Sequence, residues 1–245
     1  MIKLENVEWS GLETAVRGMR NPMNSWDRTD SDFEADMLGP NDAKLMESLA
    51  KGGPVHAKYR RFITVAMDIV APLYWWKEFD TYKVGVCCNS CSTMHKIADH
   101  EFTMDDFSTD KMVDATAVAL EEVINCLNKF RDLYLAEKDD DIKKLYWWQM
   151  IQLLPSSYNQ RRTIMMNYEV ANHIVNDRMD HKLDEWRELC LALIHLPHAE
   201  VMFDYWLNEK YKFLVKAEKL SDVGQSNIMA IREMEAVRNG DKENG

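Results

Sequence analysis

The chain has 245 residues, 46% of them hydrophobic and 29% charged, which is typical of a globular protein with one sizeable domain or two small ones. Its formal net charge of -11 repels nucleic acid and anionic lipid and so disfavours both as partners, although a local basic pocket could still hold a small anion. No apolar run approaches the ~20 residues of a membrane-spanning helix. The start MIKLENVEWS lacks a basic stretch followed by an apolar one, so we expect no signal peptide, no membrane association and a cytoplasmic location.

The first third of the chain predicts a strand followed by a helix. Residues 2–9 alternate apolar and polar side chains, as a half-buried strand does. Ser10 and Glu13 then form a capping-box pattern, so we expect a helix that starts at Ser10. That helix should stop at Asn21, because Pro22 disfavours helical geometry in the residue before it.

A second helix and a second strand are predicted next. Asn41 is a candidate N-cap for a helix that Gly52 and Gly53 would end. Residues 60–71 are rich in β-branched side chains and alternate in polarity, which predicts a strand that Pro72 ends.

The second half of the chain has a helical pattern. Helices are predicted over residues 109–137, 141–153, 159–178, 184–195 and 199–218. The fold class is therefore α+β, with an antiparallel sheet formed early and a large helical part. We expect a single domain over residues 1–221 and a polar, flexible tail over residues 222–245.

The predicted helix at 159–178 carries candidate ligand-binding residues. Asn167 and Arg178 would share one face with the apolar residues between them, about 16 Å apart along the axis. Arg178 offers a planar fork for a phosphate or a pyrimidine carbonyl, and Asn167 offers a donor and an acceptor. Spacing alone favours a structural role for both residues.

The same segment resembles a known motif. Residues 153–178 read LLPSSYNQRRTIMMNYEVANHIVNDR, with Leu154 and Pro155 ahead of Asn167 and Arg178. This order and spacing resemble the C-terminal half of the flavin-dependent thymidylate synthase signature. The resemblance covers about residues 58–205.

The resemblance implies roles for three residues of this segment. Asn167 and His173 correspond to residues that hold the flavin of FAD, and Arg178 corresponds to the arginine that holds the uracil of dUMP. Glu169 and Ile151 stand where the family has arginines, so the expected pocket loses positive charge.

Residues 81–95, TYKVGVCCNSCSTMH, resemble the family's Arg-His-Arg motif in altered form. Thr81, Tyr82 and Lys83 stand for Arg-His-Arg and are assigned to the cofactor. Glu78, just upstream, stands for a glutamine that contacts the nucleotide.

The rest of the motif is matched after one inserted residue. Asn89 is assigned to the cofactor, whereas Ser90 and Ser92 are assigned to the substrate. Met94 replaces the last arginine. The family uses such arginines for charge-assisted bonds to phosphate, and the possible substitutes in this chain are Arg60, Arg61, Arg161 and Arg162.

The resemblance implies a homotetrameric enzyme that transfers a one-carbon unit from methylenetetrahydrofolate to C5 of dUMP, with NADPH reducing the FAD. Arg178 would be the catalytic residue that orients and polarises the uracil. The altered motif keeps two alternatives open. One is modification of another pyrimidine nucleotide, such as hydroxymethylation, and the other is an inactive homologue that acts as a binding subunit.

The cysteines allow a competing interpretation. There are five, an odd number, and Cys87, Cys88 and Cys91 are clustered, which does not suggest a secreted disulfide framework. Cys88 and Cys91 with His95 and His100 could bind zinc. A single CxxC pair is weak evidence, however, so we assign no metal site.

Overall fold

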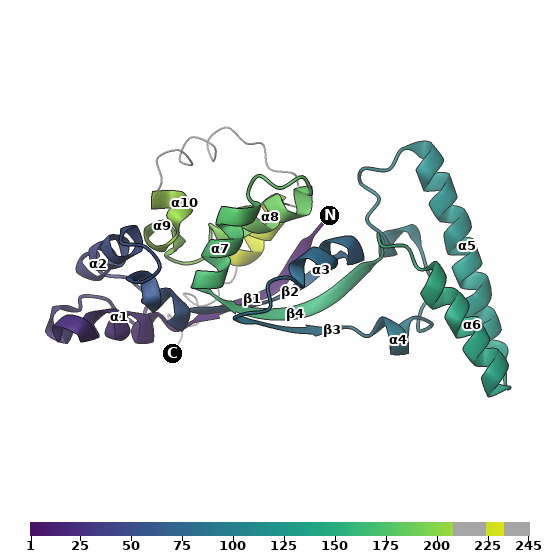
Figure 1. Cartoon of the computed structure of the whole chain (residues 1–245), viewed down its shortest axis with the longest axis horizontal. Coiled ribbons are helices and arrows are strands. Elements are labelled where there is room, and N and C mark those ends of the chain that lie inside the picture. Colours follow the sequence, from purple (N-terminus) through teal and green to yellow (C-terminus); the bar gives the residue numbers. More distant parts are fainter. Residues whose placement is uncertain (208–223, 233–245) are drawn as a thin grey trace. The chain divides into compact units, whose positions relative to one another are not determined.

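The computed structural model describes residues 1–207 and 224–232 (Figure 1). The chain divides into two compact units. Unit 1 comprises Met1, Val70–Thr81 and Asn89–Arg162, and unit 2 comprises Ile2–Ile69, Tyr82–Cys88 and the chain from Thr163 onward. Each unit is described below by itself.

The described residues form one four-stranded antiparallel sheet, so the predicted α+β fold class is confirmed. Its strands are β1 (Lys3–Ser10), β2 (Thr64–Pro72), β3 (Val86–Ser90) and β4 (Asn159–Asn167), in the order β1-β2-β4-β3. In β2 the side chains alternate between buried and half-buried, as predicted for this segment. The strand begins at Thr64 rather than residue 60, because Ala57–Phe62 forms a 3-10 helix.

The predicted helix at 159–178 is wrong in its first half. Residues 159–167 form β4, and only Tyr168–Arg178 form a helix, α7. From Thr163 to Asn167 the side chains alternate between the two faces of the sheet, with Ile164 and Met166 buried. Strand β4 pairs with β2 on one side and β3 on the other, and this pairing overrides the helical preference of its methionines.

Both predicted N-caps are also wrong. Helix α1 (Leu12–Arg20) has Gly11 at its N-cap position, with a left-handed φ of 102°. A Cβ at Gly11 would lie 2.1 Å from the carbonyl oxygen of Phe62. The hydroxyl of Ser10 lies 3.1 Å from that of Thr64 instead of capping the helix. Helix α2 (Pro40–Lys51) is capped by Gly39 rather than Asn41. Its end at Gly52 is as predicted.

The remaining helices are α3 (Leu73–Phe79), α4 (Thr93–Lys96), α5 (Asp114–Ala136), α6 (Asp140–Leu153), α8 (Asp184–Leu193), α9 (Ala199–Met202) and α10 (Asp204–Leu207), with further 3-10 turns at Asn21–Met23, Trp26–Arg28 and Met104–Asp106. Among them, α5, α6 and α8 follow the predicted pattern, whereas α3 and α4 were not predicted. The predicted helix at 199–218 is interrupted at Phe203, whose backbone is extended. Residues 208–218 of that prediction lie outside the described residues.

Part of the predicted tail is ordered. Residues 224–232 are helical, and Asn227 is only 1% exposed. Its side chain accepts a hydrogen bond from the backbone N–H of Leu4 at 2.9 Å and donates one to the carbonyl of Ile2 at 3.1 Å. These nine residues therefore pack on β1 rather than extend as a flexible tail. The domain boundary at residue 221 stays a prediction.

Unit 1 contains a helical hairpin with its own apolar cluster. Helices α5 and α6 pack side by side (Figure 1). The buried members of the cluster are Ile97, Ala98, Phe102, Phe107, Leu120, Ile124, Leu127 and Met150. None of the described helices is long and apolar enough to cross a membrane.

In unit 2 a polar network anchors α7. The guanidinium of Arg60, 1% exposed, donates to the Asp204 carboxylate at 2.8 Å and to the carbonyl of Met202. The same carboxylate accepts hydrogen bonds from Asn172 at 3.0 Å and Asn176 at 3.1 Å, both on α7. The network therefore ties α7 to the segment before β2 and to the start of α10.

We predict that Asp204→Asn makes folding stability less dependent on pH in acid. Burial raises the pKa of the Asp204 carboxyl, but hydrogen bonds from Asn172 and Arg60 outweigh it and the net pKa is lowered. Because the pKa of Asp204 is lower in the folded state, its carboxylate stabilises the fold at pH values above the unfolded-state pKa, which is near 4. This stabilisation is lost as the pH falls through the folded-state pKa. Thermal unfolding from pH 7 to pH 3 should show a variant that is less stable at pH 7, with the gap closing in acid.

The matched control is Glu13→Gln. Glu13 lies 3.8 Å from Arg17 on the exposed face of α1, where an ion pair contributes little. Its unfolding curve should follow that of the wild type. A constant gap between wild type and Asp204→Asn across this pH range would contradict the role given to the carboxylate.

Candidate functional site

The site is built on the junction between β4 and α7, where the strand passes into the helix without a loop (Figure 1). Asn167 is the last residue of the strand and the N-cap of the helix, and its side-chain oxygen accepts a hydrogen bond from the N–H of Val170 at 3.0 Å. Tyr168 is buried, and it donates from its N–H to the carbonyl of Ile63 at 2.9 Å and from its hydroxyl to that of Pro197 at 3.0 Å. The sheet thus fixes the direction in which α7 leaves it.

Arg178 lies at the other end of α7, where the helix dipole favours a cation. Its Nε donates to the hydroxyl of Tyr82 at 2.9 Å. The guanidinium carbon lies 4.7 Å from the ring centroid of Trp186 and 5.5 Å from that of Tyr82, in cation–π contact with both. The hydrogen bond to Tyr82 and the two aromatic rings therefore restrain the side chain of Arg178.

The groups around Arg178 are neutral at ordinary pH or acidic. Burial raises the pKa of Tyr82, and this outweighs the lowering by the hydrogen bond and charge of Arg178. Burial also raises the pKa of the Cys190 thiol, which contacts the carbonyl of Ile174 at 3.7 Å. The negative charge of Asp177 also raises the pKa of both groups. The positive charge of Arg178 therefore lies among partly desolvated groups.

The segment from Tyr82 to Gly85 runs alongside α7 in the opposite direction. Tyr82 contacts the C-terminal end of the helix, whereas Gly85 lies against its first turn. A Cβ at Gly85 would lie 2.9 Å from a methyl carbon of Val170 and 3.7 Å from the side-chain nitrogen of Asn167. Gly85 has a φ of 81°, so this close approach requires glycine. Lys83, between the two ends, is exposed.

Within unit 2 the structure therefore places five of the predicted side chains on α7, at its cap or in the segment beside it. Asn167, His173 and Arg178 are carried by the β4–α7 segment, and Tyr82 and Lys83 belong to the segment beside it. His173 is exposed on α7. The sequence predicts Asn167 inside the helix, whereas the structure places it at the N-cap. Asn167 and Arg178 are nevertheless separated by the length of α7.

The other five predicted residues belong to unit 1: Glu78, Thr81, Asn89, Ser90 and Ser92. Thr81 donates from its hydroxyl to the carbonyl of Glu78 at 2.7 Å, and the hydroxyl of Ser92 caps α4 by accepting from the N–H of His95 at 3.3 Å. Asn89 and Ser90 are exposed on β3. Their assignment to a cofactor or a substrate stays a prediction.

Two arginines proposed as substitutes for the lost ones have structural partners. Arg60 belongs to the Asp204 network. Arg162 donates to Gln160 at 2.9 Å and to Asp80 at 2.7 Å, and its guanidinium lies 4.3 Å from the ring centroid of Trp76. Both side chains are therefore held by the fold. Arg61 and Arg161 are exposed.

The cysteine cluster gives no support to a zinc site. Cys87, Cys88 and Cys91 are exposed at β3 and its end. Within the described parts of the chain, no group of three or more histidine, cysteine, aspartate or glutamate side chains is placed to hold a metal ion.

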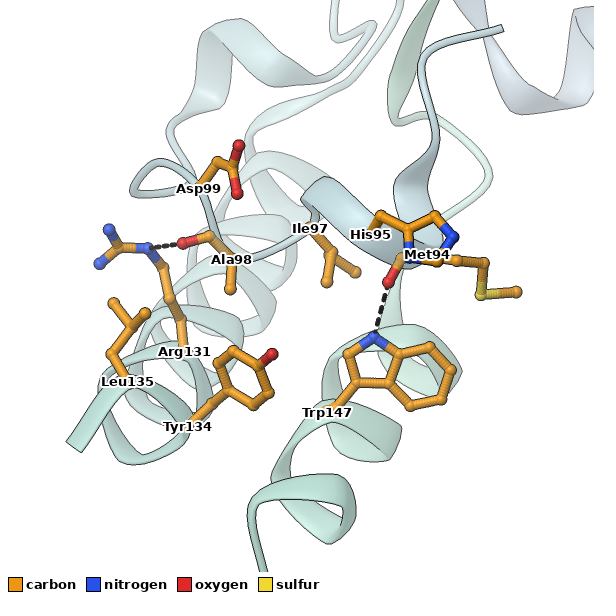
Figure 2. A pocket seen from close by; sticks show the side chains of 9 residues that line it. All are labelled: Met94, His95, Ile97, Ala98, Asp99, Arg131, Tyr134, Leu135 and Trp147. Atoms are coloured by element: carbon orange, nitrogen blue, oxygen red, sulfur yellow. Dashed lines mark hydrogen bonds between the residues drawn. The ribbon is translucent and has the colours of Figure 1, made fainter. Parts of the chain in front are cut away.

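A pocket of about 370 Å³ lies in unit 1 (Figure 2). Met94 lines it, and its carbonyl accepts a hydrogen bond from the indole of Trp147 at 3.0 Å. Arg131 donates from Nε to the carbonyl of Ala98 at 3.1 Å. The other lining residues are His95, Ile97, Asp99, Tyr134 and Leu135. Its wall thus combines polar and charged groups with apolar and aromatic ones.

Sequence reasoning missed Trp186 and Gly85. Trp186 stands in α8, eight residues after Arg178, and no spacing rule connects the two because they meet through a turn between helices. Gly85 lies in a segment without clear period, where a glycine before a short strand is the one available signal.

We predict that Asn167→Ala destabilises the protein by about 1 kcal/mol, because it removes the side-chain cap of α7. Urea unfolding measures this loss. Asn167→Asp is the matched control, since a carboxylate retains the cap and is favoured at a helix N-terminus. Equal stability of wild type and Asn167→Ala would show that the cap does not stabilise the junction.

Comparison with known proteins identifies similar structures. No protein-family model matches the sequence, and no curated protein matches it either. The fold is similar to that of thymidylate synthase X (ThyX) from Helicobacter pylori, crystallised with FAD and dUMP, with a TM-score of 0.63 and 16% identity over 85% of this chain and 100% of that chain. A second structure of that enzyme with FAD and dUMP gives a TM-score of 0.60 and 15% identity over 84% of this chain and 100% of the other. The predicted resemblance is confirmed at the level of the fold.

Proposed function

We infer that the chain is a divergent flavin-dependent thymidylate synthase. It binds FAD and dUMP, transfers a one-carbon unit from methylenetetrahydrofolate to C5 of the uracil, and uses NADPH as the reductant. The observation that supports this function is α7, which begins at Asn167 on the sheet and ends at Arg178. The helix stands on a fold similar to that of an enzyme crystallised with FAD and dUMP.

Arg178 is the residue that we assign to the uracil. A guanidinium donates two parallel hydrogen bonds to a planar partner, and a pyrimidine carbonyl beside its neighbouring ring nitrogen is such a partner. Its positive charge stabilises negative charge that develops on the carbonyl oxygen when C5 reacts. The partly buried position of Arg178 strengthens this effect, because water screens the charge less there.

The residues along α7 fit the polar edge of a flavin. The side-chain oxygen of Asn167 is used by the helix cap, whereas its amide nitrogen donates no hydrogen bond to any residue that the structure describes. A flavin edge offers carbonyl and ring-nitrogen acceptors for such a donor. His173 is exposed on the same helix, and Lys83 brings a positive charge beside it. When bound, FAD supplies the hydride for the reaction.

The described site offers little positive charge to bind the phosphates of FAD and dUMP. Thr81 and Met94 stand where the resemblance predicts arginines, and Arg60 and Arg162 are held by structural partners. Hydrogen bonds to charged groups contribute roughly 1.5–3 kcal/mol each. We therefore expect FAD to bind less tightly than it would to a site with the full set of arginines.

Two further functions share this fold. Modification of another pyrimidine nucleotide, such as hydroxymethylation, keeps the roles of Arg178 and Asn167 and changes the base contacts. A binding subunit without activity is favoured by the altered residues Thr81, Ser90 and Met94.

Assembly and location are part of the proposal. We expect a homotetramer with sites built between subunits, because the resemblance implies one. A homotetramer offers a source of positive charge that one chain lacks, since residues of neighbouring copies can complete a site. A cytoplasmic location agrees with the supply of NADPH and folate.

The proposed function is tested by the visible absorption spectrum of the purified protein. The spectrum is recorded before and after addition of excess FAD and removal of what stays free. We expect flavin bands that remain with the protein. A protein that never retains FAD would exclude both flavin-dependent reactions and leave the binding subunit.

The reaction itself is tested by product analysis. The FAD-loaded protein is incubated with NADPH and methylenetetrahydrofolate, and either dUMP or dCMP. We expect methylation at C5 of dUMP and no reaction of dCMP. A hydroxymethylated product, or turnover of dCMP alone, would replace the proposed reaction with modification of another pyrimidine.

A further inference from the structure

We propose that Tyr82 is a positioning residue, which together with Trp186 fixes the plane and direction of the Arg178 guanidinium. The proposal rests on the proposed function, in which Arg178 holds the base of the nucleotide. It changes the role predicted from the sequence, which assigns Tyr82 to the cofactor.

Three contacts within unit 2 define the arrangement. The 2.9 Å hydrogen bond from Arg178 Nε to Tyr82 fixes one edge of the guanidinium. Trp186, buried completely, supplies a rigid surface 4.7 Å from the guanidinium carbon. The rings of Tyr82 and Trp186 are 5.7 Å apart and inclined by 58°, so they contact the guanidinium from two directions. A planar group held at one edge and over one ring has little rotational freedom left.

This restraint matters because a flexible arginine binds weakly. An arginine side chain loses rotamer freedom when it is fixed in one geometry, and this loss opposes binding. In this protein the fold has already fixed it before any ligand binds. The guanidinium of Arg178 then keeps a constant direction relative to α7, and a planar ligand meets a preorganised group.

Tyrosine suits this position for two reasons. Its hydroxyl oxygen accepts a hydrogen bond from Arg178 while remaining neutral, because burial keeps its pKa above the ordinary value. It therefore orients the guanidinium without neutralising its charge. A carboxylate at the same place would form an ion pair and compete with the carbonyl of a nucleotide.

The test is a double-mutant cycle on dUMP affinity of the FAD-loaded protein. Tyr82→Phe removes the hydroxyl and keeps the ring. We expect it to raise the Kd for dUMP by about tenfold, which corresponds to one hydrogen bond to a charged group, with FAD retention and melting temperature unchanged. In the Arg178→Ala background the same change should leave the Kd unaltered, because the partner through which it acts is gone.

The other outcomes of the cycle overturn the proposal. Equal loss of affinity in both backgrounds would mean that the Tyr82 hydroxyl contacts the nucleotide itself. No loss in either background would mean that the hydrogen bond does not orient Arg178. Tyr134→Phe, which removes a tyrosine hydroxyl in unit 1, is the matched control and should leave the dUMP affinity unchanged.

A second measurement needs no ligand and separates this inference from the proposed function. Phenylglyoxal modifies accessible guanidinium groups, and mass spectrometry of peptides gives the rate at Arg178. We expect faster modification of Arg178 in Tyr82→Phe than in the wild type, with the exposed Arg17 reacting equally in both. Equal rates at Arg178 would overturn the inference, whereas a wild-type protein that binds no dUMP but shows the rate difference would overturn the proposed function alone.

Discussion

The direct passage of β4 into α7 at Asn167 is the constraint on which the candidate site depends. A strand bonded on both sides cannot rotate, and a helix that starts from its last residue inherits its direction. The Asn167 cap and the buried Tyr168 hold the first turn. Arg178, about 16 Å farther along the axis, is therefore placed by the sheet rather than by a loop.

Two polar arrangements act on the same helix with different consequences. The network of Arg60 and Asp204 holds α7 to the segment before β2 and to the start of α10. The contacts of Arg178 with Tyr82 and Trp186 fix the side chain at its end. The first network uses Arg60 for structure, and the second fixes the guanidinium of Arg178 in one direction.

The sequence predicts the fold class and the helices α5, α6 and α8, because apolar periodicity is a local property. It does not predict that residues 159–167 form a strand, since this depends on pairing with β2 and β3, which are distant in the chain. Gly11 replaces the predicted cap Ser10 because its backbone approaches Phe62, again a nonlocal contact.

The contacts among the predicted site residues are likewise nonlocal. Tyr82 and Arg178 are 96 residues apart in sequence and are joined by a hydrogen bond that the motif matches do not predict. Trp186 lies in neither motif, so no sequence pattern indicates it. What motif matching gives is the set of chemical groups, and what the structure adds is which of those groups restrain one another.

The most direct test of this account is calorimetric titration of dUMP into the FAD-loaded protein, for wild type and Arg178→Ala. The account predicts saturable binding to the wild type and a loss of about 1.5–3 kcal/mol in Arg178→Ala, as expected when a charged hydrogen-bonding group is removed. Unchanged affinity in Arg178→Ala would contradict it, because the helix would then place its arginine away from the nucleotide.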